Sequence, residues 1–213
     1  MSEQPRFVSK LVGDDAISIR AQDLASLRLI SSKLRSGGDW LEVVDGIEDV
    51  TLLFDPATLS PDEALEKASD LEVTQETRSL SRQEVELSVQ FGGENGPDMK
   101  DVCDQLEMSQ DELISTLSES DLQVDMIGFT PGFAYISGLP EALNVPRLKQ
   151  PRARVPAGSL GLAAGRCGTY ALEGPGGWPI IGKISTPLFD KNNDPPFVLQ
   201  AGMRVKLINE AHQ

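Results

Sequence analysis

The chain has 213 residues, 39% of them hydrophobic, and a formal net charge of −14 at pH 7. This length allows one large domain or two small ones with a buried core. Membrane spans are not expected, because no stretch approaches the ~20 consecutive apolar residues that a span needs. Two cysteines, Cys103 and Cys167, are too few for a disulfide framework or a metal cluster. Residues 1–16 lack the apolar core of a signal peptide, so we expect a cytoplasmic protein that binds neither a metal nor a membrane.

The charge is distributed unevenly along the chain. Residues 1–80 carry 8 basic and 16 acidic side chains, residues 81–127 carry 2 and 12, and residues 128–213 carry 9 and 5. Only the last segment is basic. Nucleic acid is not an expected partner, because surfaces that follow phosphates need many more Lys and Arg residues. A small anion in a local basic pocket agrees with this distribution.

In chain order, alternating apolar and polar residues come first. They predict four strands, at residues 6–12, 16–21, 40–46 and 49–55. Asp23 is the predicted cap of a helix between the two strand pairs. Ser60 and Glu63 form a predicted capping box that opens a second helix, which extends to about Glu72. This order predicts a small α+β domain with helices on one sheet face. The weakly patterned residues 71–84 are the expected domain boundary.

The rest of the chain changes from helical to β patterning. A strand is predicted at residues 85–91, followed by two short helices capped by Asp98 and Ser109. From Leu122 onward, short β runs separated by Gly and Pro indicate a closed or nearly closed barrel. These runs are residues 122–129, 160–164, 169–173, 178–184 and 203–208. The predicted fold is therefore an α+β domain (residues 1–80) followed by a mainly β-barrel domain (residues 81–213).

Two sequence motifs of enzymes that need no partner chain, the P-loop and the nucleophile elbow, are present only in part. Residues 177–183, GWPIIGK, have P-loop spacing, but Ile184 stands where a Ser or Thr should bind magnesium, so a strand is predicted there. Residues 157–161, AGSLG, resemble a nucleophile elbow. A nucleophilic serine needs a base, and His212, the single histidine, is one residue from the end of the sequence. No catalytic residue is assigned.

A proline-rich segment over residues 126–190 contains the strongest candidates for a binding site. Arg147, Arg152 and Arg154 fall within eight residues, and alternation places the last two on one side of a strand. Paired guanidinium groups bind carboxylate or phosphate. Aromatic residues nearby are candidate apolar walls of the same site: Phe129, Phe133, Tyr135 and Trp178. In the alternative interpretation, the aromatic residues are core and the arginines pair with the acidic first half of the chain.

Several motifs in order carry a family resemblance: GFTPGFAYISGLP, VPRLKQPRARVPAGSLGLA, GTYALEGPGGWPIIGK and PLFD. Over about Val85 to Val205, the chain resembles the KipI / allophanate hydrolase subunit 1 family, which includes the B subunit of 5-oxoprolinase. The resemblance implies a cyclophilin-like barrel and partner chains similar to KipA (the C subunit of 5-oxoprolinase) and to LamB/YcsF. It also implies ATP-dependent cleavage of 5-oxoproline to L-glutamate, with ATP used by the complex. Two alternatives are a KipI-type inhibitor of a sensor histidine kinase and a carboxyltransferase or allophanate hydrolase-type subunit of urea degradation.

The resemblance and the residue types together define a candidate site for a small anionic substrate, shared with a partner chain. We expect backbone N–H groups of the turns at residues 130–132 and 156–159 to donate to the reacting carbonyl. The candidate substrate-binding residues are Phe129, Pro131, Gly132, Phe133, Tyr135, Arg147, Arg152, Arg154, Pro156, Gly158, Ser159 and Trp178.

Overall fold

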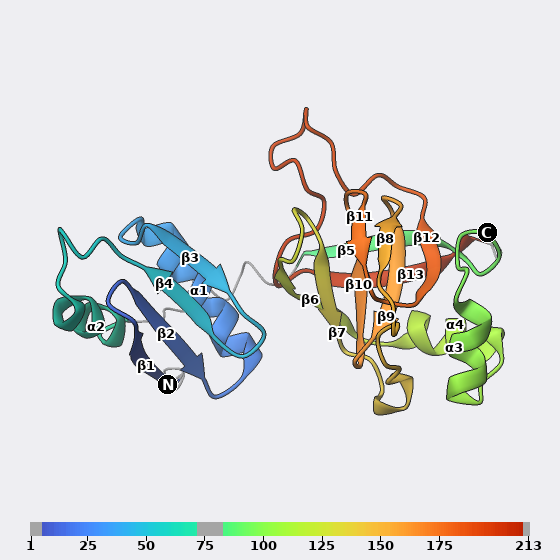
Figure 1. Cartoon of the computed structure of the whole chain (residues 1–213), viewed down its shortest axis with the longest axis horizontal. Helices are drawn as coiled ribbons and strands as arrows, with labels where there is room; N and C mark the ends of the chain where they lie inside the picture. The colour runs from blue at the N-terminus through green and yellow to red at the C-terminus, as the bar shows by residue number, and fades with distance from the viewer. Residues whose placement is uncertain (1–5, 72–82, 211–213) are drawn as a thin grey trace. The chain divides into compact units, whose positions relative to one another are not determined.

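The computed structural model describes residues 6–71 and 83–210 of the chain. It divides into two compact units, residues 1–81 and residues 82–213, which we call the N-terminal unit and the barrel unit (Figure 1). Most of the predicted boundary at residues 71–84 lies outside the described residues. Within the two described ranges, no helix combines the length and the apolar character needed to cross a bilayer.

The N-terminal unit contains an antiparallel sheet with strand order β1-β2-β4-β3. Its strands lie within the four predicted stretches: β1 (Phe7–Val12), β2 (Ala16–Ala21), β3 (Glu42–Asp45) and β4 (Val50–Leu53). Two helices, α1 (Leu24–Gly37) and α2 (Pro61–Ser69), pack their apolar residues onto one sheet face. The predicted α+β arrangement of this unit is confirmed.

Both helices of this unit begin at their predicted caps. The Asp23 carboxylate accepts a hydrogen bond from the Ser26 N–H at 2.7 Å, which lowers the Asp23 pKa. Ser60 and Glu63 form the predicted capping box. The expected end of α2 at Glu72 is corrected, because the helix ends at Ser69.

The barrel unit is a closed sheet with strand order β10-β7-β6-β13-β5-β12-β9. All pairs are antiparallel except β5 with β13, which is parallel. Closure leaves no free sheet edge, and the predicted barrel is confirmed. The strands are β5 (Glu84–Phe91), β6 (Leu122–Ile127), β7 (Ala134–Ser137), β9 (Ser159–Ala163), β10 (Arg166–Thr169), β12 (Ile180–Ile184) and β13 (Arg204–Asn209).

Helices α3 (Met99–Leu106) and α4 (Gln110–Glu119) pack their apolar faces into the barrel core, and a short 3₁₀ helix, η2 (Glu141–Leu143), follows β7. Ser109 and Glu112 form a capping box at the start of α4. Asp98 occupies the predicted N-cap position of α3, but its side chain makes no capping hydrogen bond to that helix. The Asp98 carboxylate instead accepts hydrogen bonds from the Arg152 guanidinium and the Ile180 N–H.

A short ribbon of β8 (Arg152–Val155) and β11 (Gly174–Gly176) lies outside the barrel sheet. In β9, Leu160 and Leu162 belong to the barrel core, so alternation turns Ala163 outward. There it joins a second apolar cluster that includes Val155 of the ribbon. Its buried members are Phe133, Val155, Ala163, Tyr170, Trp178 and Ile180.

The predicted strand at residues 169–173 is corrected, because β10 ends at Thr169. Directly after β10, the Tyr170 ring packs in the second cluster. The Tyr170 backbone carbonyl accepts a hydrogen bond from the Gly158 N–H at 2.7 Å.

Candidate functional site

The second cluster is centred on the buried ring of Phe133. The rings of Phe129, Tyr135, Tyr170 and Trp178 surround it edge-on, with centroids 4.8 to 5.7 Å away. Edge-to-face pairs at such distances are favourable because the positive ring edge meets the negative ring face. Phe133, which the sequence predicts as a wall of the site, therefore supports the four other rings from beneath. Those four rings line a cavity.

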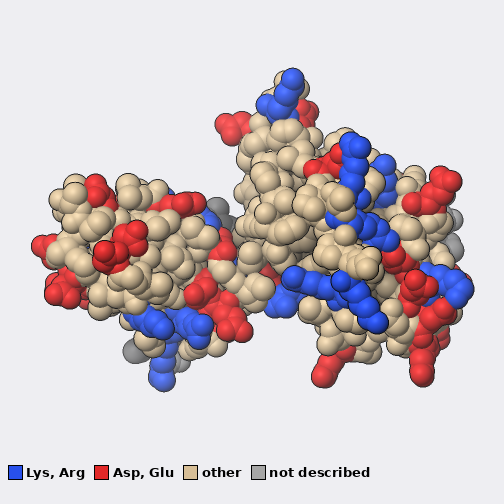
Figure 2. All heavy atoms as spheres, in the orientation of Figure 1, with Lys and Arg blue, Asp and Glu red and all other residues tan. Residues whose placement is uncertain are grey.

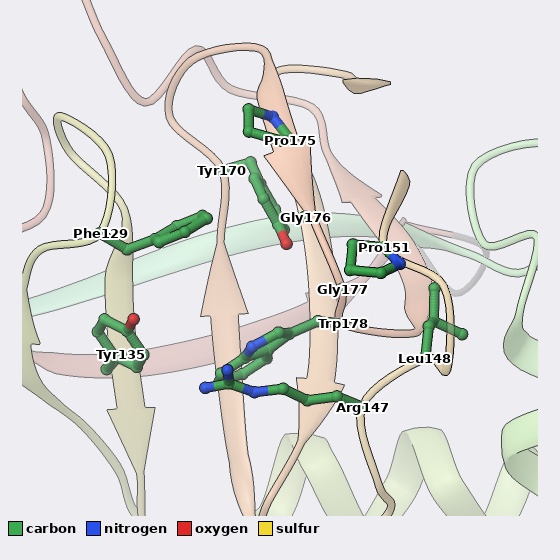
Figure 3. A pocket seen from close by; sticks show the side chains of 10 residues that line it. All are labelled: Phe129, Tyr135, Arg147, Leu148, Pro151, Tyr170, Pro175, Gly176, Gly177 and Trp178. Atoms are coloured by element: carbon green, nitrogen blue, oxygen red, sulfur yellow. The ribbon is translucent and has the colours of Figure 1, made fainter. Parts of the chain in front are cut away.

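A cavity of about 340 Å³ opens beside these rings. We call it the Arg147 pocket (Figure 3). The Arg147 guanidinium lies 5.9 Å from the centre of the Trp178 ring, a cation–π distance. Within the described residues, Arg147 has no carboxylate at ion-pair distance, so its charge is available to an anion. The lining residues are Phe129, Tyr135, Arg147, Leu148, Pro151, Tyr170, Pro175, Gly176, Gly177 and Trp178.

Two tyrosine hydroxyls add polar character to this apolar pocket. Burial raises the pKa of Tyr135, an effect that the nearby Arg147 opposes. Burial also raises the pKa of Tyr170, while a hydrogen bond with the Trp178 backbone opposes it. Both hydroxyls therefore keep their protons at neutral pH.

Phe129 is the most unusual residue of the pocket. Its side chain is 62% exposed, although its ring edge contacts Phe133. Its backbone adopts φ 68°, a left-handed conformation that is uncommon for a residue with a large side chain. Such strain concentrates at functional sites. The conformation holds the ring at the edge of the pocket.

The other two predicted arginines already have acidic partners. Arg152 donates two hydrogen bonds, of 2.8 and 2.7 Å, to the carboxylate of Asp98, which also accepts the Ile180 N–H at 2.6 Å. These contacts raise the pKa of Arg152. Arg154 lies 2.6 Å from Glu173. The alternative interpretation, in which the arginines pair with the acidic first half of the chain, therefore holds for Arg152, whereas the partner of Arg154 lies in the basic last segment.

Eight of the twelve predicted site residues line one of two separate cavities, and Pro131, Gly132, Phe133 and Gly158 line neither. Phe129, Tyr135, Arg147 and Trp178 line the Arg147 pocket. Four others line a second cavity of about 200 Å³, which we call the Ser159 pocket: Arg152, Arg154, Pro156 and Ser159. Lys and Arg side chains gather on the barrel-unit face turned to the viewer in Figure 2.

Several N–H groups of the two predicted turns bond within the protein. The Gly158 and Ser159 N–H groups already bond to the carbonyls of Tyr170 and Pro156, and the Thr130 N–H bonds to Gly128. Pro131 and Pro156 have no N–H to donate. Gly132 is buried at φ 73° against Phe197. Three of the expected N–H donors are therefore already engaged within the protein.

Sequence reasoning missed Tyr170 and the ribbon residues Pro175 and Gly176. The sequence EGPGG over residues 173–177 is a signal of an irregular segment, but Tyr170 fits the pattern of a strand. Among the described residues, no group of three or more His, Cys, Asp or Glu side chains is placed to hold a metal ion.

The fold and the pocket together define a two-unit protein with an aromatic-lined cavity on the outer face of a closed barrel. The chain belongs to the family described as carboxyltransferase domain, subdomain C and D, whose sequence model matches residues 8–199. It is 37% identical over 190 residues to the B subunit of 5-oxoprolinase from Haemophilus influenzae, covering 89% of this chain and 88% of that protein. The protein of the same name from Escherichia coli O157:H7 is 32% identical, with coverages of 93% and 94%.

Solved structures support the same fold. A conserved uncharacterized protein from Pyrococcus horikoshii is 31% identical, with a TM-score of 0.58 and coverage of 96% of this chain and 99% of that one. The protein TTHA0988 is 27% identical with a TM-score of 0.76, and this chain spans only 39% of its length. Urea amidolyase of K. lactis, at 16% identity and a TM-score of 0.72, shares the fold over 15% of its chain.

Proposed function

We propose that this chain is the B subunit of a 5-oxoprolinase, which opens 5-oxoproline to L-glutamate with hydrolysis of ATP. Its partners in this proposal are a chain similar to KipA, the C subunit of that enzyme, and a LamB/YcsF-like chain. Two relatives that are named as the B subunit of 5-oxoprolinase align over about nine tenths of the chain, which supports the assignment. The observation that carries the proposal is the Arg147 pocket, which joins aromatic walls to a cation that has no acidic partner in the described part of the chain.

The chemistry of the substrate fits this pocket. 5-Oxoproline is a small cyclic amide that carries one carboxylate. In our proposal Arg147 binds the carboxylate, since charge-assisted hydrogen bonds of guanidinium are strong, and the rings of Tyr135 and Trp178 hold the apolar side of the lactam. A protonated tyrosine hydroxyl donates to the amide carbonyl.

The Arg147 pocket does not contain a complete set of catalytic groups. Its lining includes no Asp, Glu, His or Lys, so a general base and the groups that handle ATP must come from elsewhere. Arg147 and the tyrosines bind and orient the substrate, and the partner chains supply the rest. This incompleteness is the reason to expect activity only in the complex.

Reconstitution tests the proposal. The chain is co-expressed with the two partner chains from the same genome, and glutamate release from 5-oxoproline is measured with and without ATP. We expect ATP-dependent release that disappears when this chain alone is omitted. An assembled complex that releases no glutamate, or that works equally well without this chain, would contradict the assignment. Inhibition of a histidine kinase or a urea-dependent activity in its place would favour the alternatives.

A further inference from the structure

The Ser159 pocket is a second concave site on the barrel unit, separate from the Arg147 pocket. The two cavities share no lining residue, although the segment at β8 contributes to both, with Pro151 in one and Arg152 in the other. Three of its lining side chains are basic and one is acidic. The basic residues are Arg152, Arg154 and Lys183, and the acidic residue is Glu94.

Ser159 and Lys183 face each other across neighbouring strands. They are direct partners in the antiparallel pairing of β9 with β12, which places both side chains on one sheet face. The aliphatic part of Lys183 passes over Gly158, where a Cβ atom would lie 3.5 Å from its Cγ and 3.6 Å from its Cε. The lysine stem therefore lies beside Gly158, and Lys183 lines the pocket.

The Lys183 ammonium and the Ser159 hydroxyl both lack a partner in the described part of the protein. Among the described residues, Lys183 has no carboxylate at ion-pair distance and the Ser159 hydroxyl has no hydrogen-bond partner. Ser159 is only 3% exposed, and buried hydroxyls are normally paired. Because it lines the cavity, its hydroxyl is available to a ligand there.

Arg154 supplies a third donor group. Its closest contact with Glu173 is through Nε, and the side chain is 78% exposed. An exposed ion pair of this kind contributes about 0–1 kcal/mol, so an incoming anion exchanges with Glu173 at low cost. Arg152 differs, because its two terminal nitrogens are held by Asp98.

We propose that the Ser159 pocket binds an oxyanion of the phosphate class, through Lys183, Ser159 and Arg154. An ammonium, a hydroxyl and a guanidinium converge here from three separate chain segments, β12, β9 and β8. A tetrahedral phosphate presents oxygens in several directions and can meet all three, whereas a planar carboxylate presents two. The site is independent of the proposed 5-oxoprolinase activity, since it shares no lining residue with the substrate pocket.

Calorimetric titration of the full chain with inorganic phosphate tests this site, with sodium chloride at equal ionic strength as the reference. We expect saturable binding that is weakened about tenfold or more in Lys183→Gln and in Ser159→Ala, the loss typical of one charge-assisted hydrogen bond. Lys149→Gln removes an exposed lysine outside both pockets and should bind phosphate like the unchanged chain. Thermal melts verify folding, and Lys183 is exposed, so its variant decides even where Ser159→Ala fails to fold.

Two further titrations define the ligand. ADP binding that inorganic phosphate competes away would identify a nucleotide phosphoryl group as the occupant, and binding of phosphate alone would identify the free anion. Acetate binding as strong as phosphate binding would overturn the phosphate assignment. Absence of saturable binding of both phosphate and ADP, or equal affinities in Lys183→Gln and Lys149→Gln, would overturn the site. None of these measurements depends on glutamate release.

Discussion

At the level of single residues, the Arg147 pocket depends on a glycine in β10, Gly168, which has no side chain to occupy the space beside the rings. A Cβ atom on Gly168 would lie 2.6 Å from the Phe133 ring and 2.9 Å from the Trp178 ring. Both rings belong to the cluster that supports the pocket. The glycine is therefore needed for close approach of the rings to the barrel wall. Cys167, the residue before Gly168, is a core residue whose thiol is inert, because burial raises its pKa to about 12.

We expect Gly168→Ala to destabilise the protein by about 1–3 kcal/mol, the usual cost of overpacking a core. It should also weaken substrate binding, because Trp178 lines the pocket and Phe133 supports the rings that line it. Urea unfolding measures the first effect. Gly174→Ala is the matched control, since its Cβ would meet only Thr130, at 3.9 Å, and it should change stability by no more than about 0.5 kcal/mol. Equal stabilities of the two variants would contradict the packing explanation.

At the level of secondary-structure elements, Asp98 joins three parts of the barrel unit. It stands at the start of α3 and binds Arg152 of β8 and the backbone of Ile180 in β12. The ribbon of β8 and β11 has no hydrogen-bonded strand partner in the barrel. The ion pair is therefore a principal connection that holds this wall of both pockets in place.

We expect Asp98→Asn to lower the free energy of unfolding by about 1–3 kcal/mol. Breaking a buried ion pair costs more, but the Arg152 side chain is one third exposed, and solvent reduces the loss. Urea unfolding provides the measurement. Asp104→Asn breaks the exposed pair with Lys100 and should leave the free energy of unfolding nearly unchanged, because solvent screens exposed pairs. If both variants lost the same stability, Asp98 would not be the connection described.

Much of the fold could be predicted from local patterns. Alternation identifies the N-terminal strands, and the caps at Asp23, Ser60 and Ser109 are predictable because each bonds within its own turn. Asp98 resembles a cap in the sequence because its partner Arg152 is 54 residues away. Strand β11 could not be predicted, because its sequence, GPG, has no alternation to detect.

At the level of the whole molecule, one basic segment serves two pockets of different character. In the sequence, Arg147, Arg152 and Arg154 form a single cluster, because local spacing does not reveal which acidic residues fold against them. In the folded chain, Asp98 pairs with Arg152 and Glu173 pairs with Arg154. Arg147 lies beside Trp178. The aromatic residues could be predicted from sequence as a group. Their division into support and wall could not, because it depends on the fold around Phe133.

The central claim is that Arg147 binds the substrate carboxylate in a complex whose other catalytic groups lie on partner chains. Steady-state kinetics of the reconstituted complex with Arg147→Gln test it most directly, alongside Lys149→Gln as the matched control. We predict a rise of about ten- to a hundredfold in KM for 5-oxoproline with Arg147→Gln, because a charge-assisted hydrogen bond is lost, and no change with Lys149→Gln. Equal KM values for the two variants in an active complex would contradict the claim.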